Sequence, residues 1–175
     1  MADTEPFLPY GKHCIEDDDI EAVAETLRSD FLTTGPKVEA FELRLAEITG
    51  AKHAIAVSNG TAALHLAAMA LDLGPGDAVV VPTLTFLATA NAARYVGAEV
   101  IFADVDPKTG LLTSDTLTDA LKRGGSDVRA VFPVHLNGQT ADMTAMTAVE
   151  GAADLAFVED SCHALGGMQT TSGGT

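Results

Sequence analysis

The sequence has few basic residues and no long apolar stretch. It contains 10 lysines and arginines against 25 aspartates and glutamates, which gives a formal net charge of −15 at pH 7. Nucleic-acid backbones are bound by clustered Lys and Arg, so this balance argues against a nucleic-acid partner. The apolar runs are interrupted every few residues and are too short to cross a bilayer, so we expect no membrane-spanning segment.

Cysteine is equally scarce, and the N-terminus carries no secretory pattern. Two cysteines, Cys14 and Cys162, cannot build a disulfide framework. The first nine residues are acidic and lack the basic and then apolar order of a secretory signal. Free thiols together with such an N-terminus predict a cytoplasmic protein.

Apolar residues, in contrast, are abundant enough to form a core. They make up 47% of the 175 residues, and charged residues make up 20%. This composition excludes wholesale disorder, which needs low hydrophobicity and high charge. The length fits one domain or part of a larger one.

Short apolar runs alternate with segments of helical pattern. Five runs are rich in Val, Ile and Phe and apolar on both faces, which is typical of buried parallel strands. They span residues 54–57, 78–81, 100–103, 129–134 and 155–158. Helices are expected at about residues 17–29, 36–49, 62–73, 86–96, 114–123 and 143–149. Ser114 is the expected N-cap of the fifth helix, and the alternation predicts an α/β fold with a mostly parallel sheet.

The segment Ser58-Asn59-Gly60-Thr61 stands where the first predicted strand leads into a helix. Gly60 lets the backbone approach a ligand closely, and the helix start presents unpaired N–H groups at the positive end of its dipole. Thr61 adds a hydroxyl donor, so the segment could hold a phosphate group. The alternative is an ordinary helix start in which Ser58 or Asn59 acts as the N-cap.

The last predicted strand ends at Glu159-Asp160-Ser161-Cys162-His163. A carboxylate at the carboxyl end of a parallel strand lies at the edge where α/β proteins bind ligands. Asp160 could hold a positively charged ring nitrogen, and His163 could donate to a ring oxygen. The alternative is that Asp160 caps the next turn and His163 is a surface histidine.

Phe86 follows the second predicted strand, on the same expected edge of the sheet. It is one of only seven phenylalanines and could stack on a planar ligand. The alternative is a core phenylalanine at the start of a helix.

Other motifs of small-ligand chemistry are missing. There is no glycine–lysine loop of the Walker type, and residues 74–77 lie between a helix and a strand, the reverse of a dinucleotide fingerprint. Ser58, Asp160 and His163 have the residue types of a hydrolase triad, but Ser58 lacks the Gly-x-Ser-x-Gly elbow. The five histidines show no metal-ligand spacing, so no metal is expected. His65, in an apolar helix, is expected to be buried and hydrogen-bonded.

Seven segments in register resemble the DegT/DnrJ/EryC/StrS family of sugar aminotransferases, which use pyridoxal phosphate and have fold type I. They are Pro9-Tyr10-Gly11-Lys12 and residues 32–36, 58–64, 82–91, 102–106, 134–139 and 158–166. The resemblance covers nearly the whole chain. It implies a three-layer α/β fold with a mostly parallel sheet, the large domain of fold type I in incomplete form.

The same resemblance implies pyridoxal 5′-phosphate as the cofactor and a role for each candidate residue. Gly60 and Thr61 would bind the phosphate, and Phe86 would stack on the ring. Asp160 would pair with the ring nitrogen, and His163 would donate to the ring hydroxyl. The residues implied to line the substrate side are Tyr10, Asp30, Phe31, Leu32, Thr33 and Gly60.

Within the family, Pro9-Tyr10-Gly11-Lys12 and the loop at residues 31–36 are most similar to the transaminases of pseudaminic acid synthesis. Those enzymes convert a UDP-linked 4-keto-6-deoxy-N-acetylhexosamine to the 4-amino sugar. The resemblance therefore implies a nucleotide-sugar substrate, glutamate as amino donor, and a homodimer.

In the family, the lysine that binds the cofactor comes after the aspartate–histidine segment. The lysines of this sequence are Lys12, Lys37, Lys52, Lys108 and Lys122, and none has that context. We therefore expect this lysine, and a small C-terminal domain, beyond Thr175. Residues 1–35 are expected to form an N-terminal helix and substrate-side loop, and residues 36–175 part of the large domain.

Other interpretations of the sequence remain open. One is a short gene product, or a binding or regulatory protein that keeps the cofactor pocket without the chemistry. Another is a related sugar dehydratase, which would have histidine at the lysine position. A generic nucleotide-binding α/β domain is a third, against which the missing glycine fingerprint counts.

Overall fold

The computed structural model describes residue 7 and residues 11–169. The chain divides into two compact units, Met1–Ala56 and Val57–Thr175, and each is described by itself. The sequence-based division at residue 35 stays a prediction about domain roles.

The first unit contains two helices, α1 (Asp17–Arg28) and α2 (Pro36–Thr49), at the predicted positions. The amide of Glu16 donates to the carboxylate of Asp19 at 2.9 Å, and the acidic first turn of α1 suits the positive end of the helix dipole. α2 begins with a proline, whose missing N–H would be unpaired there in any case. It ends at Gly50, whose φ of 71° is the left-handed conformation that stops a helix.

The second unit is built on a parallel sheet with the strand order β2–β1–β3–β4 in the described part of the chain. The strands are β1 (Ala78–Pro82), β2 (Glu99–Ala103), β3 (Val128–Val131) and β4 (Ala156–Phe157). β1 is central, and Val80 pairs with Ile101 on one side and with Val131 on the other. All of β1 is buried, as expected for a strand covered on both faces.

Helices precede and connect these strands. They are α3 (Gly60–Ala70), α4 (Leu87–Tyr95), α5 (Ser114–Gly124) and α6 (Met143–Thr147), with two short 3₁₀ helices, η1 (Gly125–Asp127) and η2 (Leu136–Gly138). Among the described residues, none of the helices has both the length and the apolar character that a membrane span requires.

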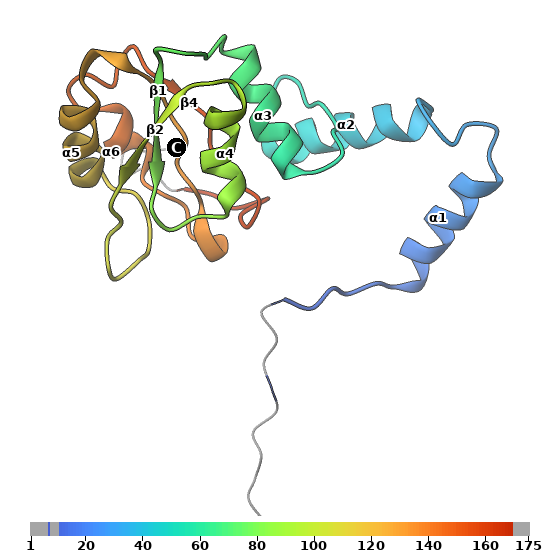
Figure 1. Ribbon diagram of the computed structural model, residues 1–175. Helices are drawn as coiled ribbons and strands as arrows, with labels where there is room; N and C mark the ends of the chain where they lie inside the picture. Colours follow the sequence, from blue (N-terminus) through green and yellow to red (C-terminus); the bar gives the residue numbers. More distant parts are fainter. Residues whose placement is uncertain (1–6, 8–10, 170–175) are drawn as a thin grey trace, which may run out of the picture. The chain divides into compact units, whose positions relative to one another are not determined.

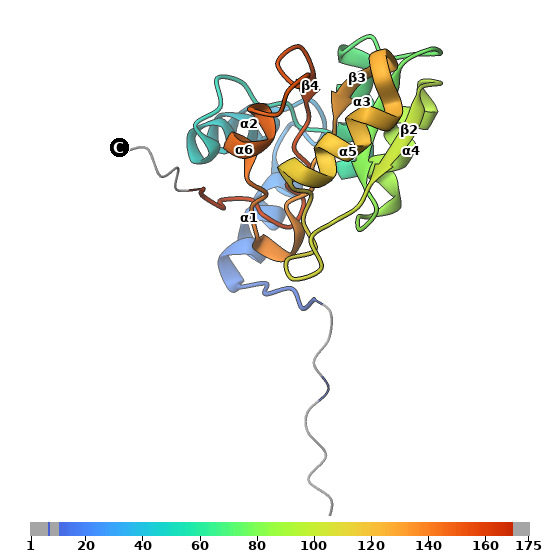
Figure 2. The same ribbon diagram turned by 90° about the vertical axis from the view of Figure 1, so that its left-hand side faces the viewer.

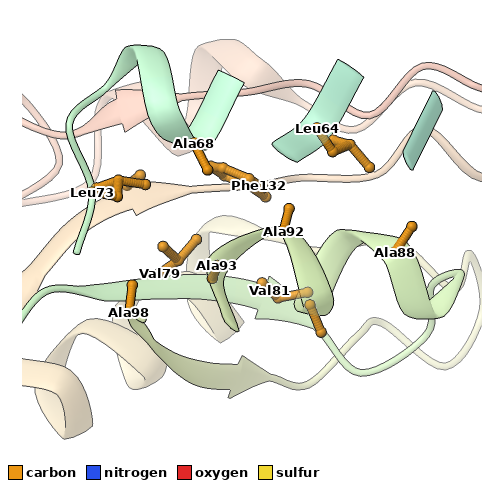
Figure 3. Close-up of a cluster of buried hydrophobic side chains, with 12 residues drawn as sticks. Leu64, Ala68, Leu73, Val79, Val81, Ala88, Ala92, Ala93, Ala98 and Phe132 are labelled. Atoms are coloured by element: carbon orange, nitrogen blue, oxygen red, sulfur yellow. The ribbon is translucent and has the colours of Figure 1, made fainter. Parts of the chain in front are cut away.

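The helices cover both faces of the sheet, so the second unit has three layers (Figures 1 and 2). Val79 and Val81 pack with apolar residues of α3 and α4 in one buried cluster, which Figure 3 shows. Val80 packs on the opposite face with Leu117 of α5 and Met146 of α6. Neighbouring side chains of β1 thus alternate between the two clusters, as the period of a strand requires. The predicted α/β class is confirmed.

The run at residues 54–57 is an exception, because the structure forms no strand there. Ile55 is 79% exposed, and the amide of Ala56 donates to the carboxylate of Glu42 at 2.7 Å. A strand needs a neighbouring strand for its N–H and C=O groups, and here a side chain is the partner of the amide. The predicted first strand is therefore wrong for the part of the chain that the structure describes.

The predicted strand at residues 129–134 is interrupted near its end. β3 stops at Val131, and Pro133 has no N–H with which to continue the ladder. Pairing returns at Val134, which forms an isolated parallel bridge with Asp160. This bridge extends the sheet beyond β4 and places Asp160 beside the end of the neighbouring strand.

Two local predictions are corrected. The N-cap of α5 is Thr113 rather than Ser114, because the Thr113 hydroxyl accepts a hydrogen bond from the amide of Thr116 at 3.3 Å. His65 is half-buried rather than buried, and its ring centroid lies 5.2 Å from that of Tyr95.

Candidate functional site

The site is centred on Asp160, whose backbone is fixed by the sheet. Its amide donates to the carbonyl of Pro133 at 2.9 Å, and its carbonyl accepts from the amide of His135 at 3.0 Å. These bonds continue the parallel pairing past the carboxyl ends of β3 and β4. Asp160 therefore lies at the edge of the sheet where ligands of α/β proteins bind, as the sequence predicts.

The side chain of Asp160 is a buried carboxylate held by neutral donors. The residue is only 6% exposed. Its Oδ2 accepts from the Thr89 hydroxyl at 2.8 Å, and its Oδ1 accepts from the amide of Cys162 at 3.2 Å. No lysine or arginine of the described residues forms an ion pair with it. Burial of a carboxylate is costly without a compensating partner, so this arrangement favours a positively charged ligand atom next to Asp160.

The Thr89 hydroxyl is itself part of a short chain of hydroxyl groups. Thr89 is completely buried in the first turn of α4, and its Oγ1 lies 2.8 Å from Oγ1 of Thr85. Sequence reasoning missed both threonines as site residues. The signal was their spacing of four residues directly after β1, which brings two side chains to one side of a helix start.

Cys162 adds a third donor to the Asp160 carboxylate. The hydrogen bond of its thiol to Asp160 is the main reason that the pKa of Cys162 is raised to about 11, and partial burial raises it further. The thiol therefore stays protonated at neutral pH. A protonated thiol is a poor nucleophile, so Cys162 acts here as a hydrogen-bond donor.

The start of α3 meets this loop at Gly60. A Cβ atom on Gly60 would lie 2.9 Å from the Sγ atom of Cys162, closer than side-chain carbons pack. The two segments that the sequence singled out, at residues 58–61 and 159–163, are thus brought together by the fold. Only glycine fits between them without displacing the thiol.

The start of α3 is capped and still keeps free donors. Asn59 is the N-cap, and its side-chain oxygen accepts from the amide of Ala62 at 2.9 Å. The amides of Gly60 and Thr61 have no acceptor among the described residues. The alternative interpretation of Asn59 as an N-cap is therefore correct, and it is compatible with anion binding at the same helix start.

Phe86 lies at the N-cap of α4 and is 75% exposed. The alternative that it is a core phenylalanine is therefore wrong. The carbonyl of Phe86 accepts from the amide of Thr89 at 3.1 Å, so the exposed ring and the donor to Asp160 belong to one helical turn. An exposed aromatic ring on the same helical turn as the donor to a buried carboxylate is suited to a planar cationic ligand.

His163 is exposed in the turn that follows Asp160. A Cβ atom on Gly138 would lie 3.8 Å from the carbonyl oxygen of His163, so this turn is close to η2. Its role as a donor to a ring hydroxyl stays a prediction.

A second histidine, His135, holds the residue that precedes Asp160. It is 4% exposed, and its Nδ1 accepts from the amide of Ala141 at 3.0 Å. Because Nδ1 uses its lone pair as an acceptor, Nε2 carries the proton and donates to the carboxylate of Glu159 at 2.8 Å. The ring thus ties Glu159, the neighbour of Asp160, to the segment after β3.

Of the predicted substrate-side residues, Gly60 alone belongs to this unit. Tyr10 lies outside the described residues. Asp30, Phe31, Leu32 and Thr33 are exposed in the first unit, between α1 and α2. Their role toward a substrate therefore stays a prediction.

A cavity of about 510 Å³ lies at the other edge of the sheet, near the amino ends of β3 and β4. It is lined by residues of α5, η1 and the segment before β4, among them Lys122, Glu150 and Asp154. Asp160 and Gly60 are not among its lining residues, so it is separate from the candidate site.

Comparison with known proteins matches this chain to one family. The model of the DegT/DnrJ/EryC1/StrS aminotransferase family matches residues 13–174. Among solved structures, DesV from S. venezuelae has 34% sequence identity and a TM-score of 0.78, covering 84% of this chain and 39% of that chain. An aminotransferase from Psychrobacter cryohalolentis has 34% identity and a TM-score of 0.81, and the match covers 91% of this chain and 40% of that chain.

A third similar structure is that of Spr1654 from Streptococcus pneumoniae in its PLP form, which is described as a sugar aminotransferase. It has 30% identity and a TM-score of 0.83, covering 91% of this chain and 44% of that chain. The chain thus spans about two fifths of the length of the structures it resembles. These likenesses confirm the predicted fold, part of the large α/β domain of fold type I.

Proposed function

Because this chain belongs to the DegT/DnrJ/EryC1/StrS aminotransferase family, we propose that it is part of an enzyme that uses pyridoxal 5′-phosphate to aminate a keto sugar. The observation that carries the proposal is the Asp160 carboxylate. It is buried at the edge of the sheet where ligands of α/β proteins bind, and the described residues provide it with hydrogen-bond donors but with no lysine or arginine partner. A protonated pyridine nitrogen is the kind of partner that this arrangement lacks.

The residues around Asp160 fit the remaining parts of the cofactor. The free amides of Gly60 and Thr61, at the positive end of α3, are suited to a phosphate group. The exposed ring of Phe86 is suited to stacking on the pyridine ring. His163, in the turn after Asp160, is proposed as the donor to the ring hydroxyl.

When bound, pyridoxal phosphate supplies an aldehyde that reacts with amines and a ring that accepts electrons. The task proposed for Asp160 is to hold a proton on the ring nitrogen. An ionised carboxylate in a partly dry site favours the charged form of the group beside it. Gly60, Thr61 and Phe86 would hold the phosphate and the ring in a fixed orientation, which lowers the entropic cost of reaction.

The proposed substrate, amino donor and oligomeric state are based on the resemblance of two segments of the first unit. Pro9-Tyr10-Gly11-Lys12 and the loop at residues 31–36 support a UDP-linked 4-keto-6-deoxy-N-acetylhexosamine as substrate, as in pseudaminic acid synthesis. We propose glutamate as amino donor, a homodimer as the active form, and a cofactor-binding lysine beyond Thr175. Tyr10, Asp30, Phe31, Leu32 and Thr33 are proposed to contact the sugar nucleotide.

The proposal is tested with the full-length gene product, pyridoxal phosphate, glutamate and the 4-keto sugar nucleotide. We expect glutamate-dependent formation of the amino sugar and of 2-oxoglutarate. Asp160→Asn should lower turnover per bound cofactor by at least about tenfold, because a charge-assisted hydrogen bond contributes roughly 1.5–3 kcal/mol. The matched control is Asp154→Asn, at the opposite edge of the sheet, which should leave turnover unchanged.

Two results would contradict the proposal. Turnover of Asp160→Asn within a factor of about two of wild type would correspond to well under 1 kcal/mol and would exclude the role of Asp160. Release of water from the sugar without amino transfer would indicate a dehydratase of the same family.

A further inference from the structure

We propose that Thr89 is a positioning residue for Asp160, and that Thr85 fixes the direction of the Thr89 hydroxyl. The inference rests on the proposed function, since it concerns how Asp160 is presented to the ring nitrogen. It is based on the bond from Thr89 Oγ1 to Asp160 Oδ2, 2.8 Å long and buried.

The hydroxyl groups form a chain with one direction. A carboxylate can only accept, so the Thr89 proton must be directed to Asp160. The Thr89 oxygen is then free to accept, and Thr85, at 2.8 Å, is the donor. The order Thr85 to Thr89 to Asp160 follows, and each bond polarises the next.

These bonds leave acceptor positions of Asp160 open to a ligand. A carboxylate has about four lone-pair sites. The Thr89 hydroxyl uses one on Oδ2, and the Cys162 amide uses one on Oδ1. A ring N–H would be a further donor. With both oxygens held, the carboxylate cannot rotate away from that donor.

The same bond connects the two ring-binding residues of the site. Thr89 and Phe86 belong to one turn of α4, in which the Thr89 amide donates to the Phe86 carbonyl. Asp160 follows β4, on a different part of the chain. The Thr89–Asp160 bond therefore sets the spacing between the exposed aromatic ring and the buried carboxylate. A stacked pyridine ring needs that spacing if its nitrogen is to reach Asp160.

The experiment compares two phosphate ligands in the full-length protein. Pyridoxamine 5′-phosphate has a ring nitrogen, whereas benzyl phosphate has a phosphate and an aromatic ring without one. The two ligands also differ in the ring hydroxyl and aminomethyl groups, so the contact with Asp160 is read from the change that each variant makes in the ratio of their dissociation constants. The ratio is measured by equilibrium dialysis without any turnover. The variants are Thr89→Val, which keeps the shape and removes the donor, Thr89→Ser, which keeps the donor, and Thr85→Val.

We expect wild-type protein to prefer pyridoxamine phosphate, and Thr89→Val to lose about tenfold of that preference with unchanged affinity for benzyl phosphate. A single hydrogen bond to a charged acceptor is worth roughly tenfold or more in an equilibrium. Thr89→Ser should restore the preference. Thr85→Val should lower the preference for pyridoxamine phosphate about threefold, because Thr85 acts on Asp160 only through Thr89. Thr118→Val is the matched control, since the Thr118 hydroxyl bonds only within α5, to the carbonyl of Ser114.

The outcomes separate this inference from the proposed function. Equal affinity of wild-type protein for the two ligands would overturn both. A wild-type preference that is unchanged in Thr89→Val would overturn the positioning role alone, as would an equal loss of affinity for both ligands. If Thr89→Val does not fold, Thr85→Val decides: an unchanged preference in that variant overturns the inference, and a reduced one supports it.

Discussion

Gly60 and Cys162 are in such close contact that a Cβ atom on Gly60 would lie 2.9 Å from the cysteine Sγ. Gly60 begins α3, and Cys162 follows Asp160 beyond β4. The contact brings a helix start with two free amides against the loop that carries the buried Asp160. It explains why residue 60 has no side chain, although its backbone conformation would accept one.

Replacing Gly60 by alanine should therefore have an effect that depends on Cys162. Gly60→Ala alone should destabilise the protein by about 1 kcal/mol or more, because overpacking displaces the thiol from Asp160. In a Cys162→Ala background the same change should be neutral or stabilising by up to about 1 kcal/mol, since alanine is the better helix former. Denaturant unfolding of the four proteins measures this coupling. Additive effects would show that the two residues do not touch.

The reactivity of Cys162 should report on the charge of Asp160. In a Cys14→Ser background Cys162 is the sole thiol of the 175-residue sequence, on which the measurement is made. Because its pKa is about 11, its alkylation rate should still rise about tenfold per pH unit between pH 8 and 10. Asp160→Asn removes the negative charge and should lower this pKa, so the rate at pH 8 should rise by about tenfold or more. An alkylation rate that reaches a plateau near pH 9 in the protein that keeps Asp160 would contradict the hydrogen bond between the Cys162 thiol and Asp160.

Phe86 should matter for ligand binding and little for stability. Phe86→Ala should change the free energy of unfolding by less than about 0.5 kcal/mol, because the side chain is 75% exposed. It should weaken the binding of both pyridoxamine phosphate and benzyl phosphate, since both lose a stacking partner. The matched control is Phe132→Ala in the core, where the residue is fully buried and the expected cost is about 3–5 kcal/mol. A large loss of stability in Phe86→Ala would show that Phe86 is a core residue.

The loop of the first unit should affect the sugar nucleotide and not the cofactor. Phe31→Ala is expected to raise the KM for the 4-keto sugar nucleotide several-fold and to leave pyridoxamine phosphate affinity unchanged. Phe31 is 60% exposed, so truncation should cost little stability. Steady-state kinetics with the full-length protein, with Val23→Ala as an equally exposed control on α1, measures the difference. An unchanged KM would exclude the predicted substrate contact.

Much of this structure could be predicted from local sequence pattern. The helices at residues 17–28 and 36–49 and the buried run of β1 are where apolar spacing, proline and glycine place them. The run at residues 54–57 has the same composition as a strand but pairs with no strand in the described part of the chain. Composition indicates how well a segment suits a strand, but a strand forms only where an adjacent strand is available for hydrogen bonding.

The sequence by itself determined the order of the helices from α1 to α6 and of the strands between them, and it identified the candidate site, because propensity, helix capping and strand-end motifs act over a few residues. It identified Gly60, Phe86, Asp160 and His163 as candidates. Only the tertiary structure decided that the Thr89 hydroxyl reaches Asp160, that Cys162 packs on Gly60, and that Phe86 is exposed rather than in the core. Thr89 and Asp160 are far apart in the chain, and no local pattern encodes the distance between them. That distance follows from how α4 packs on the sheet and from the bridge that carries Asp160 beyond β4.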